Sequence, residues 1–223
     1  MDTLKQLQNK NPQIKLESVF DASFAAYGRV LEGAKADKAV AHARKIWKVE
    51  DKVEANISVP EFEADDDLKA TVGNRVFGGM PFEVGWVRGR NDALTAVEWH
   101  QGSEAHVPLE DCILLVALAT DIKWNPEPSI DSSTVRGFYC PKGTIVELFQ
   151  WALHYAPVNV SRMTGFCNLF VLPRGTGNPL PFTPDKSKAE NALLVATNIW
   201  FIEHKEGMKS GFYGPLAKIN PLD

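Results

Sequence analysis

The sequence predicts a mainly β protein, a barrel or sandwich preceded by helices, and three observations lead to this prediction. After about residue 75, short runs rich in Val, Ile, Phe and Trp follow one another at regular spacing. Turn-forming stretches such as RGRND, QGSE and PKGT separate them. No helix-length pattern lies between the runs, which argues against alternating strands and helices. We expect a single domain over residues 1–223, with a helical and extended N-terminal decoration over 1–55 and a β-barrel over 56–223.

The first third of the chain has a helical and irregular character. In LESVFDASFAAYGRVLEG a strand-like run comes first, and Asp21 then stands as an N-cap before apolar residues at helical spacing. The segment ADKAVAHARKIWKV has the pattern of a second, amphipathic helix with a solvated basic face. The acidic segment EFEADDDLKA suits a loop or the start of a helix.

The rest of the chain supplies the predicted strands and one long loop. The strand-like segments are FEVGWVRG, ALTAVEWH, EAHVP, CILLVAL, TVRGFYC, TIVELFQ, FCNLFVLP and ALLVATNIWFIEH. The segment PRGTGNPLPFTPDKS holds four prolines and two glycines, which predicts a long ordered loop at the rim of the barrel.

Composition and charge exclude several classes of partner. The 223 residues are 44% hydrophobic and carry a net charge of −4, whereas a nucleic-acid-binding face needs an excess of basic residues. No stretch of about 18 apolar residues is present, and MDTLKQLQNKN lacks the apolar core of a secretory signal. We therefore expect a cytoplasmic protein with no membrane or nucleic-acid partner.

The three cysteines predict buried free thiols. Cys112, Cys140 and Cys167 are odd in number, far apart and placed in apolar runs, as in a protein of a reducing compartment. Their spacing excludes a thiolate metal clip. Any metal site must therefore use histidine and carboxylate ligands.

The segment EWHQGSEAHVP, residues 98–108, concentrates such ligands. It holds two of the five histidines of the chain, in the order Glu98, His100, Glu104 and His106. Because residues two apart share a face of a strand, Glu98 pairs with His100 and Glu104 with His106, and a hairpin about QGS would bring the pairs together. If they point inward, a divalent metal can offset the loss of hydration. If the alternating apolar residues point inward instead, all four are solvated, and alternation fits both arrangements.

A further ligand has to come from elsewhere in the barrel. His154 in FQWALHYAP is the candidate, because an imidazole without partners is poorly placed among apolar residues. The alternative is a core histidine whose hydrogen bonds are satisfied. His42 and His204 lie in charged segments, where we expect them to be solvated.

These residues resemble the cupin motifs. The first cupin motif is H-x-H followed by E, and Glu98-x-His100-x3-Glu104 has that spacing, with Glu98 at the first histidine position. His154 resembles the histidine of the second motif. The resemblance implies a double-stranded β-helix and a divalent metal, Mn²⁺ or Zn²⁺ above all, held by His100, Glu104 and His154. It leaves Glu98 as ligand or base, and His106 as ligand or substrate contact.

Two narrower resemblances follow. The span from VEWHQGSEAHVPLEDCILLVA to LFQWALHYAP is similar to ureidoglycolate lyase-type cupins, although Glu104 stands where those have glutamine. Residues from roughly 10 to 182 resemble the DUF4867 family of bacterial cupin-like proteins. The segments that carry this resemblance are VFDASFAAYGRVLEG, FGGMPFEVGW, EWHQGSE, CPKGTIVEL, LHYAP and LPRGTGNPL. That resemblance implies metal-dependent sugar isomerases, including ones acting on sulfosugars such as sulfoquinovose.

The expected function is aldose–ketose isomerisation of a hexose with an anionic C6 substituent, through a cis-enediol and without an organic cofactor. Glu98 and Glu147 are the candidate proton carriers. Further substrate contacts, which an anionic group would need, are expected from the residues Arg29, Lys142, Arg174 and Thr176. The alternatives are a C–N lyase of the ureidoglycolate type and a non-catalytic sugar-binding protein. We expect a homodimer.

Overall fold

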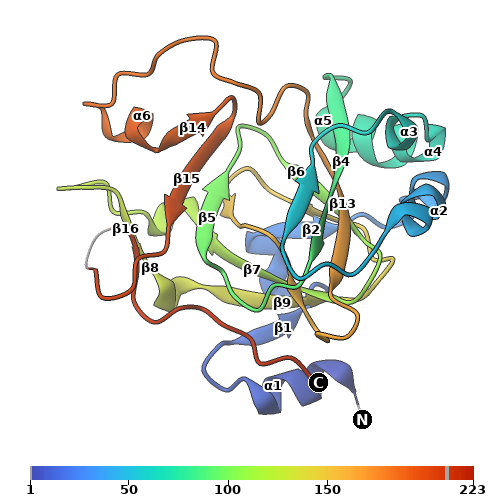
Figure 1. Ribbon diagram of the computed structural model, residues 1–223, viewed down its shortest axis with the longest axis horizontal. Helices are drawn as coiled ribbons and strands as arrows, with labels where there is room; N and C mark the ends of the chain where they lie inside the picture. The colour runs from blue at the N-terminus through green and yellow to red at the C-terminus, as the bar shows by residue number, and fades with distance from the viewer. Residues whose placement is uncertain (1, 209–210) are drawn as a thin grey trace.

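Two β-sheets face each other across the interior of the protein in the computed structural model, which describes residues 2–208 and 211–223 (Figure 1). The first sheet has the order β1 (Leu16–Ser18), β9 (Arg136–Cys140), β7 (Cys112–Leu118) and β11 (Ala152–Leu153), with β12 (Val158–Asn159) also paired to β7. The second has the order β2 (Gly28–Val30), β10 (Val146–Leu148), β6 (Glu104–Pro108), β13 (Phe166–Pro173), β4 (Phe82–Gly89) and β3 (Glu54–Asn56).

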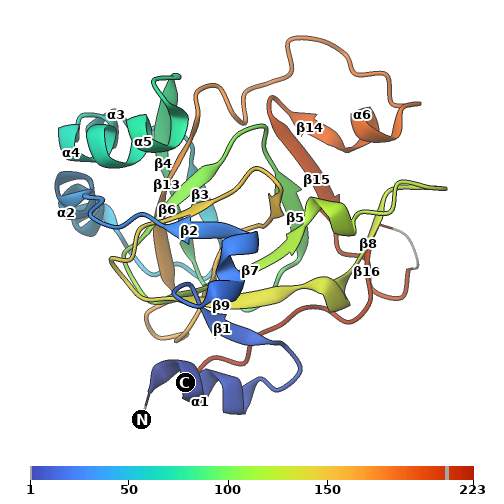
Figure 2. The same ribbon diagram turned by 180° about the vertical axis from the view of Figure 1, so that it is seen from behind.

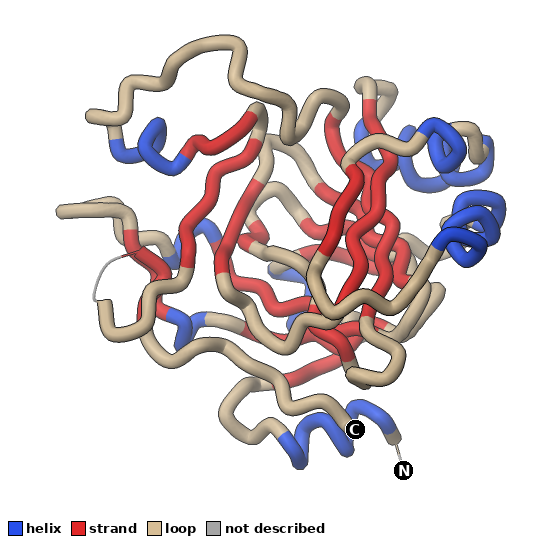
Figure 3. Tube along the Cα trace, viewed as in Figure 1, coloured by secondary structure: helices blue, strands red, loops and turns tan. Residues whose placement is uncertain are grey.

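Smaller elements surround these two sheets. One small sheet joins β14 (Leu194–Ala196), β15 (Ile199–Glu203) and β5 (Ala96–Trp99), and another joins β16 (Gly211–Tyr213) to β8 (Ser129–Asp131). The helices are α1 (Thr3–Lys10), α2 (Asp37–Ile46), α3 (Pro60–Glu63), α4 (Asp66–Leu68), α5 (Asn74–Phe77) and α6 (Ala189–Leu193). Short 3₁₀ turns are η1 (Ala22–Ala26), η3 (Ala119–Asp121) and η4 (Ser132–Thr134), and η2 (Lys69–Gly73) is a π turn. Figure 3 shows the strands at the centre and the helices at the periphery.

The predicted mainly β class is confirmed, because strands form both facing sheets and most of their pairings are antiparallel. Four predicted runs coincide with β4, β6, β7 and β13. The run ALLVATNIWFIEH instead divides into β14 and β15 at a turn where Asn198 adopts a φ of 60°. Asparagine tolerates this left-handed conformation better than the β-branched residues around it.

The N-terminal segment differs from its prediction as well. A 3₁₀ turn follows Asp21, whose carboxylate accepts a hydrogen bond from the Ser18 amide at 2.6 Å. The chain then forms β2 beside β10, where a Cβ at Gly28 would meet the carbonyl oxygen of Glu147 at 2.1 Å. Glycine is therefore needed for this close approach. Residues 1–55 contribute strands to both facing sheets as well as helices.

Three apolar clusters explain why the strands are apolar on both faces. The cluster between the sheets includes Leu114, Phe138, Val146 and Phe170. A second covers the outer face of the first sheet and includes Leu7 of α1, and a third lies between the outer face of the second sheet and α2 to α5. Figure 2 shows α1 and the group α2 to α5 on different sides of the sheets. The central strands β6, β7 and β13 thus bury both of their faces.

The two ends of the described chain lie side by side (Figures 1 and 2). The Asn11 side chain donates to the carbonyl of Asn220 at 3.1 Å, and the Asn220 amide donates back to Asn11 at 2.6 Å. Lys10 adds a hydrogen bond to the carbonyl of Pro221. None of the helices in residues 2–208 and 211–223 is both long and apolar enough to cross a lipid bilayer.

Candidate metal centre

Three short segments bring the candidate ligands together. Glu98 and His100 lie on and just after β5, Glu104 and His106 lie on β6, and His154 follows β11. The strands β5 and β6 do not form the expected hairpin, since β5 pairs with β15 whereas β6 pairs with β10 and β13. The main chain of Glu98 instead bonds that of His154, at 2.7 and 3.0 Å, and so brings the second-motif segment to β5.

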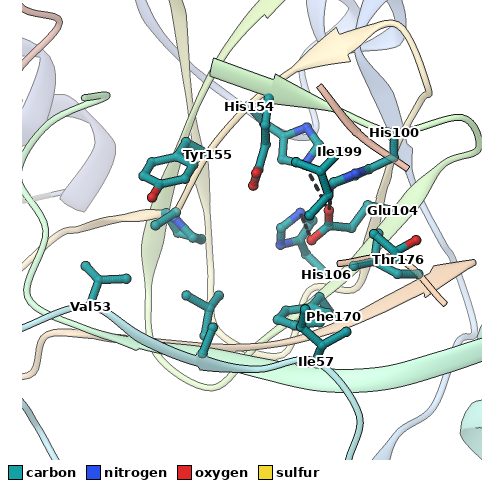
Figure 4. A pocket seen from close by; sticks show the side chains of 16 residues that line it. Val53, Ile57, His100, Glu104, His106, His154, Tyr155, Phe170, Thr176 and Ile199 are labelled. Atoms are coloured by element: carbon teal, nitrogen blue, oxygen red, sulfur yellow. Dashed lines mark hydrogen bonds and ion pairs between the residues drawn. The ribbon is translucent and has the colours of Figure 1, made fainter. Parts of the chain in front are cut away.

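Glu104 is the centre of the cluster, and three imidazoles surround its carboxylate (Figure 4). Its Oε2 atom lies 2.9 Å from Nε2 of His154 and 3.2 Å from Nε2 of His100. Its Oε1 atom lies 3.3 Å from Nε2 of His106. All four side chains are buried. The face of β6 that carries Glu104 and His106 is therefore turned to the interior, which decides the question that alternation left open.

The opposite ring nitrogens fix the orientation of two imidazoles. Nδ1 of His100 lies 2.9 Å from the carbonyl oxygen of Asn198, and Nδ1 of His154 lies 2.8 Å from that of Ala152. Because a carbonyl oxygen only accepts, each Nδ1 carries the proton, and a neutral ring then presents an Nε2 lone pair to the cluster. Partners of this kind set the tautomer of metal-binding histidines.

The residues fit a divalent metal ion. Nε2 of His106 is a buried polar atom with no hydrogen-bond partner among the described residues, since its 3.3 Å approach to Glu104 lacks hydrogen-bond geometry. Ligand atoms of Glu104, His106 and His154 lie within 4.8 Å of one another, as do those of Glu98, His100 and His154. Neutral imidazole with carboxylate suits Zn²⁺, Mn²⁺ and related ions. An ion bound here would satisfy the unpaired nitrogen.

Burial and charge act on the pKa values of the cluster in opposite directions. Burial alone would raise the pKa of Glu104, but His106, His154 and His100 hold it well below its usual range. Burial lowers the pKa of His106 to about 4. Burial would also lower the pKa of His154, yet the Glu104 carboxylate raises it to about 9. At neutral pH the metal-free cluster thus holds a His154 imidazolium beside the Glu104 carboxylate.

A cavity of about 280 Å³ opens beside the cluster, and four cluster residues line it together with Glu98. Glu98 as a whole residue is partly buried, and desolvation of its carboxyl raises its pKa. Thr176 also lines the cavity, as the predicted rim loop implies. Its hydroxyl donates to the carbonyl of Pro173 at 2.7 Å and accepts from Asn198 at 2.9 Å. The structure therefore uses this hydroxyl to hold the loop.

The structure does not bring Glu147 or Arg29 to the cavity. Glu147 pairs in register with Ala105 on β6, so its side chain lies on the face opposite Glu104 and His106. There its carboxylate accepts a hydrogen bond from Arg29 at 2.7 Å, and neither residue lines the cavity. Glu147 therefore does not share the cavity with Glu98 and the cluster.

The other two expected cations also lie away from the cavity lining. Arg174 binds the carboxylate of Glu63 at 2.7 Å on the surface. Lys142 lies in the turn after β9, where its amide donates to Asp111 at 2.9 Å. Lys and Arg are common in exposed loops, so nothing in the sequence distinguishes a cation that binds a substrate from one that makes a surface contact.

Sequence reasoning missed two asparagines that support the cluster. Asn198, in the β14–β15 turn, holds His100 through its carbonyl and Thr176 through its side chain. Asn168, fully buried on β13, lies 3.3 Å from Nδ1 of His106. A polar residue in the apolar run FCNLFVLP was the available signal for Asn168, because a buried amide needs partners.

The chain is similar to several solved structures, whereas no curated protein matches it. Among solved structures, Bacillus subtilis oxalate decarboxylase is similar over 57% of this chain and 27% of its own, at 13% identity and a TM-score of 0.33. Salicylate 1,2-dioxygenase from Pseudoaminobacter salicylatoxidans is similar over 61% of this chain and 31% of its own, at 13% identity and a TM-score of 0.32. The chain thus spans less than a third of the length of either protein.

A family model described as a domain of unknown function, DUF4867, matches residues 16–217. This range includes the four residues of the cluster and Glu98, and it leaves out only the segment that contains α1 and the last residues of the chain. The protein is therefore a member of the DUF4867 family.

Proposed function

We propose that the protein is a divalent-metal-dependent aldose–ketose isomerase. The observation that supports this most is the convergence of three buried imidazole Nε2 atoms on Glu104, with a second carboxylate, Glu98, at the edge of the same cavity. His100, Glu104, His106 and His154 would hold the ion. An ion bound there supplies a Lewis acid and a template for two neighbouring substrate oxygens.

In this proposal Glu98 carries the proton. Glu98 lines the cavity, and its carboxylate forms no hydrogen bond or ion pair with the other described residues, unlike that of Glu104. It takes the proton from C2 of an open-chain aldose and returns it to C1, while the O2 hydroxyl proton passes to O1 through a cis-enediol. The number of atoms and electrons in the sugar is unchanged. The reaction therefore needs neither a redox partner nor an organic cofactor.

The test compares Glu98→Gln with the parent protein after both are loaded with Mn²⁺. We expect Glu98→Gln to keep the metal content of the parent, because four other ligands remain, and to lose interconversion by a factor of about 10²–10⁴, the range for a general base. Sugar interconversion is followed by NMR in D₂O, where enediol formation exchanges the carbon-bound proton for deuterium. Undiminished turnover in the variant, or in parent protein stripped by chelator, contradicts the proposal.

A further inference from the structure

The cavity has a polar end and an apolar end. The polar end is the cluster with Glu98, and Tyr155 supplies one more hydroxyl. Apart from Thr176, the rest of the lining is apolar and includes Val53, Ile57, Val87, Phe170, Leu172 and Ile199. Figure 4 shows Val53 and Ile57 across the cavity from His100 and His154. A bound molecule would thus meet two different environments along its length.

Strand register gives the extent of the apolar end. Phe170 on β13 is the partner of His106 on β6, so the apolar wall begins one strand away from the cluster. On the next strand, β4, Val87 is the partner of Ala55 on β3. Three strand spacings of about 4.8 Å separate β6 from β3, or about 14 Å in all. The apolar wall is therefore longer than the part of a sugar that would lie at the cluster.

The wall requires glycine at position 85. This residue is the partner of Phe170, and a Cβ there would lie 2.6 Å from the Phe170 ring and 2.2 Å from the carbonyl oxygen of Asn56. Because Gly85 has no side chain, the Phe170 ring can lie against β4 and β3 can pair close by. Glycine at position 85 thus leaves room for the Phe170 ring in the cavity wall.

The charge of the lining argues against an anionic substrate. Among the described residues, no lysine or arginine lines the cavity, while two carboxylates, Glu98 and Glu104, do. The cations expected to clamp an anion make their contacts elsewhere, Arg29 with Glu147 and Arg174 with Glu63. A phosphate or sulfonate placed against the buried part of the wall, at Phe170 and Val87, would lose hydration without gaining a cationic partner.

We propose that the substrate is a neutral sugar whose end far from the carbonyl is deoxygenated, of the class of a 6-deoxyaldose. This inference rests on the proposed isomerase, which places the carbonyl and its neighbouring hydroxyl at the cluster. The methyl group and the adjoining carbons then lie over Phe170 and Val87. Burial of that methyl group contributes to binding, whereas a hydroxyl at the same place is desolvated without a partner.

The test measures binding to full-length protein loaded with Mn²⁺, by ligand-detected NMR and calorimetry. The probes are matched at every carbon except C6: 6-deoxyglucose, glucose and glucose 6-phosphate, with the corresponding galactose and mannose sets. In at least one set we expect the deoxy sugar to bind about fourfold tighter than its parent hexose, as one buried methyl group implies. The phosphate should bind at least about tenfold more weakly. Phosphate binding as tight as that of the deoxy sugar, or no binding in any set, overturns the inference.

A pair of variants tests the same point from the side of the protein. Val53→Lys adds a cation to the cavity lining. Val53 is 42% exposed, so water can solvate the new ammonium group and the fold should tolerate the substitution. We expect it to strengthen glucose 6-phosphate binding about two- to fivefold without changing metal content. Met163→Lys is the matched control, because Met163 is 77% exposed and does not line the cavity. An equal effect of both variants contradicts the assignment of this end of the cavity.

Binding and turnover separate this inference from the proposed function. If the deoxy sugar binds preferentially but no interconversion occurs, the substrate class stands and the isomerase proposal fails. If interconversion occurs with preference for the phosphate, the isomerase proposal stands and the substrate class fails.

Discussion

The Nδ2 atom of Asn168 lies 3.3 Å from Nδ1 of His106, and the orientation of this amide selects which nitrogen of His106 carries the proton. With the amide nitrogen toward the ring, Nδ1 accepts and Nε2 is protonated toward Glu104. With the amide turned by 180°, Oδ1 accepts from Nδ1 and the Nε2 lone pair faces the cluster. A metal ion requires the second arrangement, since only a lone pair can bind it.

We therefore predict that Asn168 controls metal affinity through His106. Asn168→Leu removes the acceptor with little change in size and should weaken Mn²⁺ binding about 10–100-fold, the range for partners of metal-bound histidines. Asn168→Asp keeps an acceptor and should retain most of the affinity. Competition with a chelator measures the affinity, and ¹⁵N NMR of the His106 ring reports the tautomer. Parent-like affinity in Asn168→Leu would remove His106 from the ligand set.

His154→Ala should lose the metal. It removes the imidazole closest to Glu104, at 2.9 Å, so we expect affinity to fall by more than the roughly 10–100-fold typical of outer partners. His42→Ala is the matched control, because that ring packs edge-on against Phe62 at 5.6 Å, outside the cluster. Metal analysis gives occupancy and circular dichroism gives folding. Full occupancy in a folded His154→Ala protein would show that the ion binds elsewhere.

The stability of the metal-free protein should be greatest near pH 6.5. The pKa of His154 is raised to about 9. The stability that its imidazolium contributes is therefore complete below the ordinary histidine pKa of 6.5, and it is lost as the pH rises from 6.5 through 9. The pKa of His106 is lowered to about 4, so the unfolded state gains a proton first and stability falls as pH drops from 6.5 toward 4. Calorimetry after chelator treatment measures the melting temperature across this range.

His154→Gln isolates the alkaline half of that profile. The stability difference between parent and variant should shrink steadily between pH 6.5 and 9, because only the parent has the imidazolium to lose. A difference that stays constant over this interval would mean that His154 is not charged in the metal-free protein.

Glu147 should affect stability and not chemistry. Its carboxylate is buried on the outer face of β10 and pairs with a half-exposed Arg29 at 2.7 Å. Glu147→Gln keeps the shape but removes the charge, so we expect a loss of about 1 kcal/mol in the free energy of unfolding. Metal content and turnover should match the parent protein, as measured by urea unfolding, metal analysis and the deuterium-exchange assay. A loss of turnover with normal stability would return Glu147 to a catalytic role.

The strands were largely predictable because their signal is local. Short runs rich in Val, Ile, Phe and Trp, bounded by turn residues, marked β4, β6, β7 and β13 at their observed bounds. The N-terminal strands were less predictable, since β2 pairs with β10, far away in the sequence, and this close approach needs glycine at position 28. The β14–β15 turn depends on the left-handed conformation of Asn198, which no periodic pattern records.

The sequence by itself determined which residues can share a face: Glu98 with His100, Glu104 with His106, and His154 as their distant partner. Only the tertiary structure decided that this face points inward, because the apolar face of β6 is also buried, under α2 to α5. It likewise placed Glu147 on the outer face, joined Arg174 to Glu63, and built an apolar wall from β13, β4 and β3. These outcomes depend on the pairing of strands far apart in the chain, and the period of a single strand contains no information about its neighbours.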